Sequence, residues 1–160
     1  NYFQIAFASN GIGIARGIPG MGLSGGNLDD QIIGTAIDET LYGARGNDRL
    51  IGGGGNDQLW GDDGNDTLIP GDGATTLWGG RGKDTFVINQ GQATIQDFSL
   101  NDSDVIDLSA FNLSGRALIH NSRNSDAGAR IAVPAGNSET TVLLTSTLTQ
   151  QLLLGINLLL

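Results

Sequence analysis

Large apolar residues recur at every ninth position between residues 25 and 87 of this 160-residue chain. The residues before each of them are rich in Gly, Asn and Asp, so each nine-residue unit reads as a turn followed by a very short strand. The apolar positions are Ile32, Leu41, Leu50, Leu59, Leu68, Leu77 and Phe86. So short a strand cannot bury its one inward side chain alone, and we expect the units to coil and stack around a shared core. The pattern predicts an all-β solenoid.

A carboxylate occupies the sixth position of six of the seven units. These residues are Asp30, Glu39, Asp48, Asp57, Asp66 and Asp84, and the remaining unit has Thr75. In stacked turns the carboxylates would lie roughly 5 Å apart, the spacing of neighbouring strands, and would repel one another. Because no Lys or Arg occupies this position, we expect a cation from solution to separate them.

Calcium suits such a column best. It is a hard ion that takes about six to eight oxygen ligands, including backbone carbonyls, and Gly-rich turns can bring carbonyls close to it. Magnesium prefers strict octahedral geometry and keeps its waters, whereas zinc favours the Cys that this chain lacks. The pattern therefore indicates several calcium ions.

The best-formed units, GARGNDRLI, GGGGNDQLW and GDDGNDTLI, resemble the G-G-x-G-x-D-x-U-x repeat of RTX calcium-binding proteins, in which U is a large apolar residue. The resemblance covers residues 25–87 and extends loosely to about residue 111, where TIQDFSLNDSDVIDLSAF is similar to the segment after the repeats in serralysin-type proteases, secreted lipases and large adhesins. It implies a parallel β-roll in which two units form one turn and calcium lies between turns on each edge.

The same resemblance implies the ligands, which are the sixth-position carboxylates and backbone carbonyls of the first four positions. The residues that it assigns to calcium are Asp30, Glu39, Gly43, Arg45, Gly46, Asp48, Gly52, Gly53, Gly55, Asp57, Gly61, Asp63, Gly64, Asp66, Gly79, Gly80, Gly82, Asp84 and Asp97.

Alternate units form the two edges of such a roll. The first edge would carry Asp30, Asp48, Asp66 and Asp84, and the second edge would carry Glu39, Asp57, Thr75 and Ala93. The second edge has lost a carboxylate at Thr75 and has Ile37 where Gly is expected. The first edge departs from the pattern only at Leu28, where Gly is expected. We therefore expect three good sites on the first edge and fewer, weaker sites on the second.

Three aromatic residues, Tyr42, Trp60 and Trp78, occupy ninth positions that are 18 residues apart. Stacked on one face, they would form either a platform for carbohydrate or a surface packed against the flanking segments. We expect the packed arrangement, because continuous apolar stripes are seldom left exposed.

The flanking segments complete the predicted organisation. Residues 1–24 read as a linker or the end of a preceding domain, 25–96 as the roll, and 97–160 as a C-terminal β-strand cap. Alternating patterns at 129–133 and 140–145 predict strands in a small, sandwich-like cap. The uncharged tail is too interrupted by polar residues for a membrane span, and the resemblance implies that it is a type I secretion signal.

Charge and composition limit the functions that this chain can have. Residues 29–107 hold 15 of the 17 acidic residues, a surface that would repel nucleic acid. The stretch 22–26 matches G-x-S-x-G, but neither a strand-to-helix turn nor a nearby His accompanies it, so we expect no catalytic constellation. The predicted function is a secreted or cell-surface calcium-binding module that folds on meeting calcium and supports export by the type I machinery together with preceding domains. The alternatives are an adhesive or carbohydrate-binding surface, or the tail of a protease, lipase or alginate epimerase.

Overall fold

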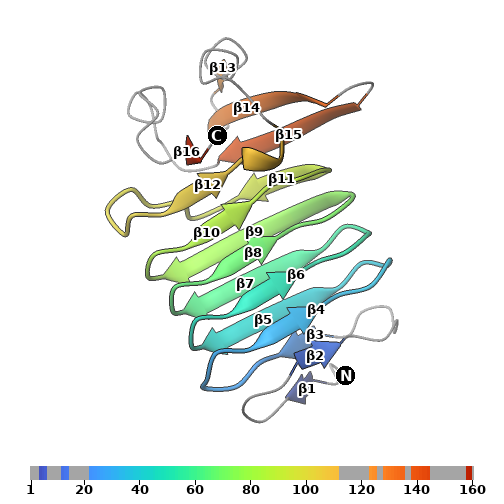
Figure 1. Cartoon of the computed structure of the whole chain (residues 1–160), viewed down its shortest axis with the longest axis vertical. Helices are drawn as coiled ribbons and strands as arrows, with labels where there is room; N and C mark the ends of the chain where they lie inside the picture. The colour runs from blue at the N-terminus through green and yellow to red at the C-terminus, as the bar shows by residue number, and fades with distance from the viewer. Residues whose placement is uncertain are drawn as a thin grey trace.

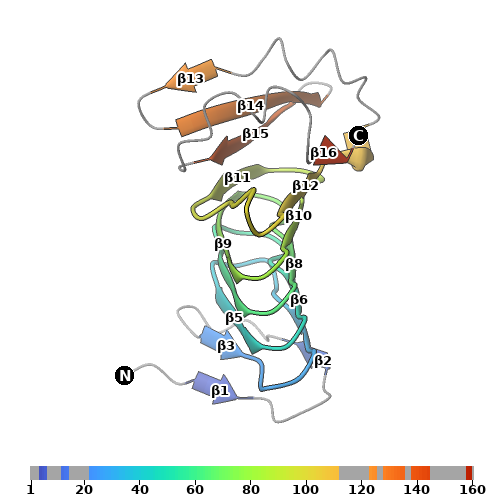
Figure 2. The same ribbon diagram turned by 90° about the vertical axis from the view of Figure 1, so that its left-hand side faces the viewer.

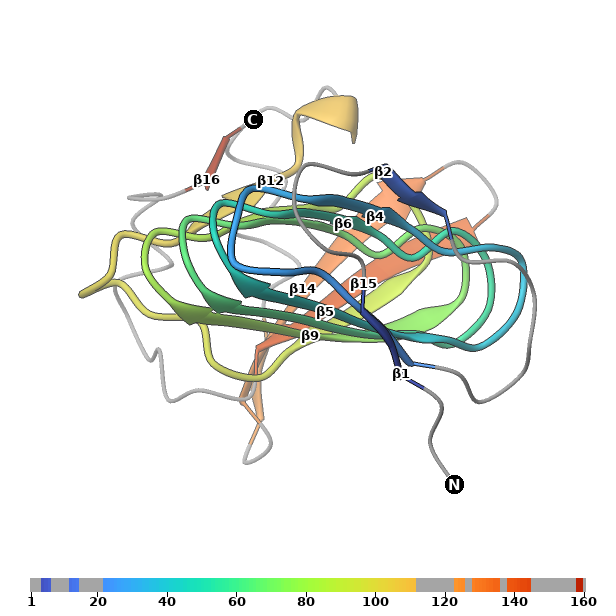
Figure 3. The same ribbon diagram turned by 90° about the horizontal axis from the view of Figure 1, so that it is seen from below.

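The computed structural model describes residues 4–6, 12–14, 22–111, 123–125, 128–135, 138–144 and 158–159. The chain coils into a flattened parallel solenoid with one sheet on each face (Figures 1 and 3). Within these ranges the helical content is one short 3-10 helix, η1 (Ser109–Phe111). No described helix has the length and apolar character needed to cross a bilayer. The all-β roll predicted from the sequence is confirmed.

The strands alternate between the two sheets as the chain advances. The first sheet has the order β1 (Gln4–Ala6), β3 (Gly22–Ser24), β5 (Thr40–Arg45), β7 (Gln58–Asp63), β9 (Ala74–Arg81), β11 (Gln92–Ile95), β15 (Ser138–Leu144), β14 (Gly128–Ala135) and β13 (Arg123–Ser125). The second has the order β16 (Leu158–Leu159), β12 (Val105–Asp107), β10 (Thr85–Val87), β8 (Thr67–Ile69), β6 (Arg49–Ile51), β4 (Gln31–Ile33) and β2 (Ile12–Ile14).

The register fixes the turn at two sequence units. Leu41 pairs with Leu59, which pairs with Leu77, so equivalent positions lie 18 residues apart in neighbouring strands. All seven eighth-position residues point between the sheets and are at most 1% exposed. Because each strand contributes a single inward side chain, this core exists only when the turns are stacked.

The roll is longer than the repeat. At its beginning, β1 pairs with β3 and β2 pairs with β4, both in parallel, so the segment predicted as a linker or preceding domain adds strands to the two sheets. At its other end, β12 pairs with β10 through Phe86 and Ile106, a spacing of 20 residues in place of 18. The predicted boundary at residue 96 therefore falls inside a further turn.

The described strands of the C-terminal cap extend the sheets of the roll (Figure 2). Strand β15 adds to β11 in parallel, and β14 and β13 follow in antiparallel order. The strands predicted at 129–133 and 140–145 correspond to β14 and β15. The uncharged tail that follows Glu139 was interpreted as a secretion signal, and apart from its residues in β15 and β16 it lies outside the described residues.

Candidate metal centre

The turns between the sheets stack backbone on backbone. The fourth-position glycines Gly46, Gly55, Gly64, Gly73 and Gly82 all have positive φ. A Cβ atom at Gly64 would collide with the carbonyl oxygen of Gly46 in the turn before it. Leu28 and Ile37, which stand at the fourth position of the first two units, are not among the described residues with positive φ. The first two turns therefore differ in conformation from the later ones.

A column of buried carboxylates runs along the first edge. Asp48, Asp66 and Asp84 are at most 2% exposed. One oxygen of each accepts the backbone N–H of the residue one turn earlier, as in the 2.7 Å bond from the Asp48 N–H to Asp66 Oδ1 and the 2.9 Å bond from the Asp66 N–H to Asp84 Oδ1. These bonds hold each carboxylate rigidly in the space between two turns.

The second oxygen of these carboxylates has no hydrogen-bond partner among the described residues. This holds for Oδ2 of Asp48, Asp57, Asp66 and Asp84, all of them buried. A buried carboxylate oxygen without a donor is costly, so each one needs explanation. These four atoms are the strongest indication of a cation site in the described part of the chain, and Oδ1 of Asp30, at the start of the first column, is also buried without a partner there.

A second oxygen borders the same space. A Cβ atom built on Gly43 would lie 2.5 Å from Asp48 Oδ2 and 2.6 Å from the carbonyl oxygen of Gly61 in the next turn. Gly61 has the same relation to Asp66 Oδ2 and the Gly79 carbonyl, and Gly52 to Asp57 Oδ2 and the Pro70 carbonyl. We call this space, which a side chain at the first position would fill, the cradle.

Burial raises the pKa of these carboxyl groups. The pKa of Asp66 rises from 3.8 to about 7, chiefly because burial disfavours the charged form, and the neighbouring carboxylates of Asp84 and Asp48 add to the rise. The pKa values of Asp48, Asp57 and Asp84 rise to about 6, again mainly through burial. The protein groups around the cradle thus disfavour negative charge there, and a cation would stabilise it.

The second edge has fewer unpartnered carboxylates. Asp57 is its one described carboxylate with an unpartnered oxygen. Glu39 accepts the Thr35 N–H at 2.9 Å with Oε2 and the Thr35 hydroxyl with Oε1. Thr75 places a buried hydroxyl without a partner at the next level, and Ala93 continues the column with a methyl group. The second edge therefore offers fewer unpartnered carboxylate oxygens than the first, and the number of ions on each edge stays a prediction.

The remaining predicted residues surround the cradles. First-position glycines border them, second- and fourth-position glycines shape the turns, and Arg45 and Asp63 are exposed third-position residues. Asp63 forms a 3.6 Å ion pair with Arg81. Asp97 accepts the N–H groups of Gly79 and Gly80 at 2.9 Å each, so it covers the last repeat turn on the first edge.

Two structural features were missed in the sequence. The column continues to Asp104, whose Oδ1 accepts the Asp84 N–H at 2.9 Å. The signal was present in Asp104-Val105-Ile106. As in the repeats, an acidic residue is followed after one variable residue by a large apolar residue, but two residues out of register.

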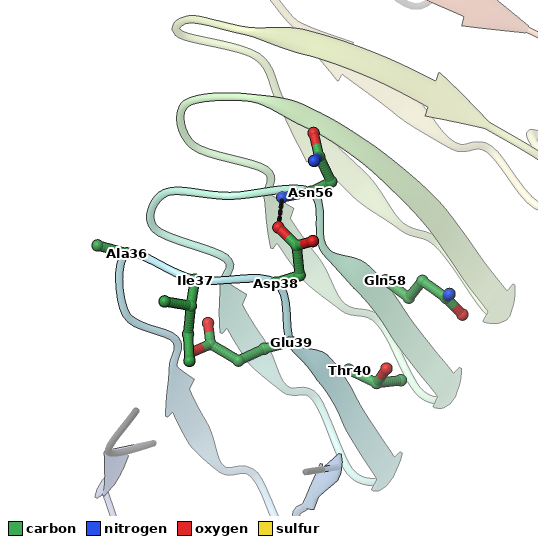
Figure 4. Close-up of a pocket in the computed structure, with 7 residues that line it drawn as sticks. All are labelled: Ala36, Ile37, Asp38, Glu39, Thr40, Asn56 and Gln58. Carbon is green, nitrogen blue, oxygen red and sulfur yellow. Dashed lines mark hydrogen bonds between the residues drawn. The ribbon is translucent and has the colours of Figure 1, made fainter. Parts of the chain in front are cut away.

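The second feature is a ladder of fifth-position side chains on the outside of each edge. Asn65 donates its N–H to Asn47 Oδ1, and Asn56 donates its N–H to Asp38 Oδ1, at 2.8 and 2.7 Å. Figure 4 shows the Asp38–Asn56 bond beside a shallow hollow on the second edge. Recurrent Asn or Asp at the fifth position was the available signal.

The aromatic column forms a continuous stack. The Trp60 and Trp78 rings lie 3.7 Å apart between centroids at 5°, and Tyr42 lies 6.2 Å from Trp60 at 22°. All three side chains are half-buried, and Trp60 Nε1 has no partner among the described residues. The facing surfaces of the two tryptophans are covered by each other. The expected packing against the flanking segments concerns residues largely outside the described ranges.

The donor set fits calcium. No group of three or more His, Cys, Asp or Glu side chains converges anywhere in the described part of the chain, so side chains alone do not enclose an ion. Carboxylate and carbonyl oxygens meet in the cradles of Asp48, Asp57 and Asp66, and calcium accepts this mixture, whereas zinc would require nitrogen or sulfur ligands. Asp48, Asp57, Asp66 and Asp84 would hold the ions together with carbonyl groups of the adjoining turns.

Comparisons with known proteins give a family model and a similar solved structure. A family model described as the RTX calcium-binding nonapeptide repeat (4 copies) matches residues 33–68 and 69–92. Among solved structures, the chain is similar to the solution structure of the AlgE6R3 subunit from the Azotobacter vinelandii mannuronan C5-epimerase, with 30% identity over 85% of this chain and 78% of that chain and a TM-score of 0.43. A comparison with curated protein sequences gives no match.

Proposed function

Because the chain belongs to the RTX calcium-binding nonapeptide-repeat family, we propose that its roll folds when the chain meets extracellular calcium. The observation that carries this proposal is that Oδ2 of Asp48, Asp57, Asp66 and Asp84 is buried without a hydrogen-bond partner among the described residues. Each oxygen needs a positive partner, and no Lys or Arg stands in the columns to supply it. Calcium bound in the cradles would neutralise the columns and link successive turns.

Folding of this chain depends on such links for a second reason. The chain contains 26 glycines and no cysteine, so ordering its turns costs much backbone entropy and no disulfide offsets that cost. Extracellular calcium modules bind with dissociation constants of roughly 10⁻⁴ to 10⁻³ M. Sites in this range would be empty at cytosolic calcium concentrations and filled outside the cell.

This difference suggests a role in export. An unfolded acidic chain would pass through the type I secretion machinery, and calcium outside would then fold it and stabilise the preceding domains of the same secreted or cell-surface protein. The module would act without catalysis in a protease, lipase, epimerase or adhesin alike. A carbohydrate platform is less well supported, because Trp60 and Trp78 cover each other's ring faces at 3.7 Å.

Circular dichroism tests the proposal. The chain is measured in excess chelator and then titrated with calcium, with magnesium at the same ionic strength as the control. We expect a largely disordered spectrum in chelator and a β-rich spectrum at millimolar calcium. A β-rich spectrum that chelator leaves unchanged would rule out calcium-dependent folding.

A further inference from the structure

The turns of the roll are of two kinds, which differ at the second position. In five turns this residue has positive φ: Ala44 (82°), Gly53 (100°), Asp62 (73°), Gly71 (85°) and Gly80 (100°). Gly26 and Thr35, the second residues of turns 25–30 and 34–39, are not among the described residues with positive φ. A change of sign here accompanies a flip of the peptide between the first and second residues, as between type I and type II turns. The flip exchanges the sides taken by the N–H and the C=O of that peptide.

In turns 25–30 and 34–39 the second-position N–H points at the carboxylate. The Gly26 N–H donates to Asp30 Oδ2 at 2.6 Å, and the Thr35 N–H donates to Glu39 Oε2 at 2.9 Å. The Thr35 hydroxyl also donates to Glu39 Oε1. We call these the amide-closed turns, because a backbone donor already occupies the position that faces Oδ2 of Asp30 or Oε2 of Glu39. The other oxygen of Asp30, Oδ1, is buried without a partner among the described residues, but it corresponds to the oxygen that accepts an N–H from the preceding turn in later units and does not face the cradle.

In the turns that end at Asp48, Asp57, Asp66 and Asp84, no described donor reaches Oδ2. We call these the open turns. In two of them the residue at positive φ is not Gly but Ala44 or Asp62. Such a conformation is uncommon for a residue with a Cβ atom and is typical of ligand clamps. The backbone is thus held in an uncommon conformation that turns N–H groups away from a buried carboxylate. A bound cation would account for both features.

We propose that the amide-closed turns take no calcium in their cradles and that the open turns do. The inference rests on the proposed calcium-dependent folding and specifies which turns respond. The cradle that Asp30 Oδ2 shares with the Gly43 carbonyl, and the one that Glu39 Oε2 shares with the Gly52 carbonyl, are closed by the chain itself. Calcium therefore binds from residue 43 onwards, above a cation-free base.

The base also positions the first ligand of each column. The Asp30 N–H donates to Asp48 Oδ1 at 2.7 Å, and the Glu39 N–H donates to Asp57 Oδ1 at 2.9 Å. These bonds orient Asp48 and Asp57 so that Oδ2 faces its cradle. The amide-closed turns are thus a template on which the calcium-binding turns stack.

Calcium counting by isothermal titration calorimetry tests the assignment with two neighbouring residues of the second edge. Glu39→Gln removes the charge from an amide-closed turn, and Asp57→Asn removes it from the open turn directly above. We expect Glu39→Gln to bind as many ions as the unaltered chain, with affinity changed less than about twofold, and Asp57→Asn to bind one ion fewer. Loss of an ion in Glu39→Gln would overturn the inference.

A gain-of-binding variant provides an independent test if Glu39→Gln fails to fold. The combination Thr35→Gly, Ile37→Gly and Glu39→Asp gives turn 34–39 the residue types of an open turn. We expect it to bind one additional ion and, by hydrogen exchange, to gain calcium-dependent protection at residues 34–39. An unchanged ion count would contradict the inference. If the unaltered chain bound no calcium, the proposed function would fail instead, so the two failures are distinguishable.

Discussion

Replacing Asp66 with Asn separates the two roles of its buried carboxylate. The amide keeps an acceptor for the Asp48 N–H, which lies 2.7 Å from Asp66 Oδ1. It removes the charge whose pKa burial and the neighbouring carboxylates raise to about 7. We therefore expect effects of opposite sign on the calcium-free and the calcium-loaded roll.

The magnitude follows from the raised pKa. Moving the pKa of Asp66 from 3.8 to about 7 corresponds to roughly 4 kcal/mol against the charged form at pH 8. Part of this arises from coupling to Asp48 and Asp84, and a buried amide donor left without a partner would cost about 1–3 kcal/mol. The Gly79 carbonyl borders the same cradle and offers such a partner. We expect Asp66→Asn to stabilise the calcium-free roll by about 2–4 kcal/mol.

The assay uses chelator and the osmolyte TMAO, which favours burial and so populates a calcium-free roll. In chelator, Asp66→Asn should fold at a lower TMAO concentration than the unaltered chain. Without TMAO, it should need a calcium concentration at least about tenfold higher than the unaltered chain needs, because ligand charge sets calcium affinity. Asp72→Asn is the matched control, since Asp72 is exposed on a turn of the same acidic roll. Equal shifts in both variants, or shifts of the same sign with and without calcium, would refute the role given to the buried carboxylate.

Three further predictions follow from the same structure. Burial raises the pKa values of Asp48, Asp66 and Asp84 to between about 6 and 7, so the calcium-free roll should be most stable below about pH 4 and lose stability as the pH rises through 6 to 7. Circular dichroism in TMAO without calcium measures this stability, and a stability that stays constant or increases with pH would contradict the prediction. Thr75→Val removes a buried hydroxyl without a partner among the described residues, so thermal unfolding in calcium should show no loss of stability. A loss above about 1 kcal/mol would show that the hydroxyl makes a hydrogen bond in the folded chain. Trp60 is half-buried and stacked on Trp78, so acrylamide should quench its emission poorly in calcium. Trp60→Ala should lower the free energy of unfolding of the calcium-loaded roll by about 3–5 kcal/mol. Efficient quenching with little loss of stability would favour an open platform.

The constant period made the roll predictable from the sequence. A nine-residue repeat with one inward apolar residue allows few architectures, and alternation of units assigns Asp48 and Asp57 to opposite edges without further information. The ends of the roll were less accessible. Strands β1 and β2 carry no repeat signal, and two additional residues before Asp104 displace it from the register.

The conformation of individual turns was the hardest feature to predict. The sequence showed Leu28 and Ile37 at glycine positions, but the hydrogen bonds to Asp30 and Glu39 depend on a peptide orientation that no periodicity encodes. Thr35, with a hydroxyl where later units often have Gly, was the nearest clue. The 18-residue spacing predicted the aromatic column on one face, whereas the parallel orientation and close approach of the Trp60 and Trp78 rings required the structure.

The presence of calcium in the cradles is tested most directly by anomalous scattering from crystals of the chain grown with calcium. The account predicts an anomalous peak beside Asp66 Oδ2 and equivalent peaks at Asp48, Asp57 and Asp84, with none beside the carboxylate of Glu39. A well-ordered roll with no peak at Asp66, its Oδ2 bonded instead to a protein donor or water, would contradict the central claim.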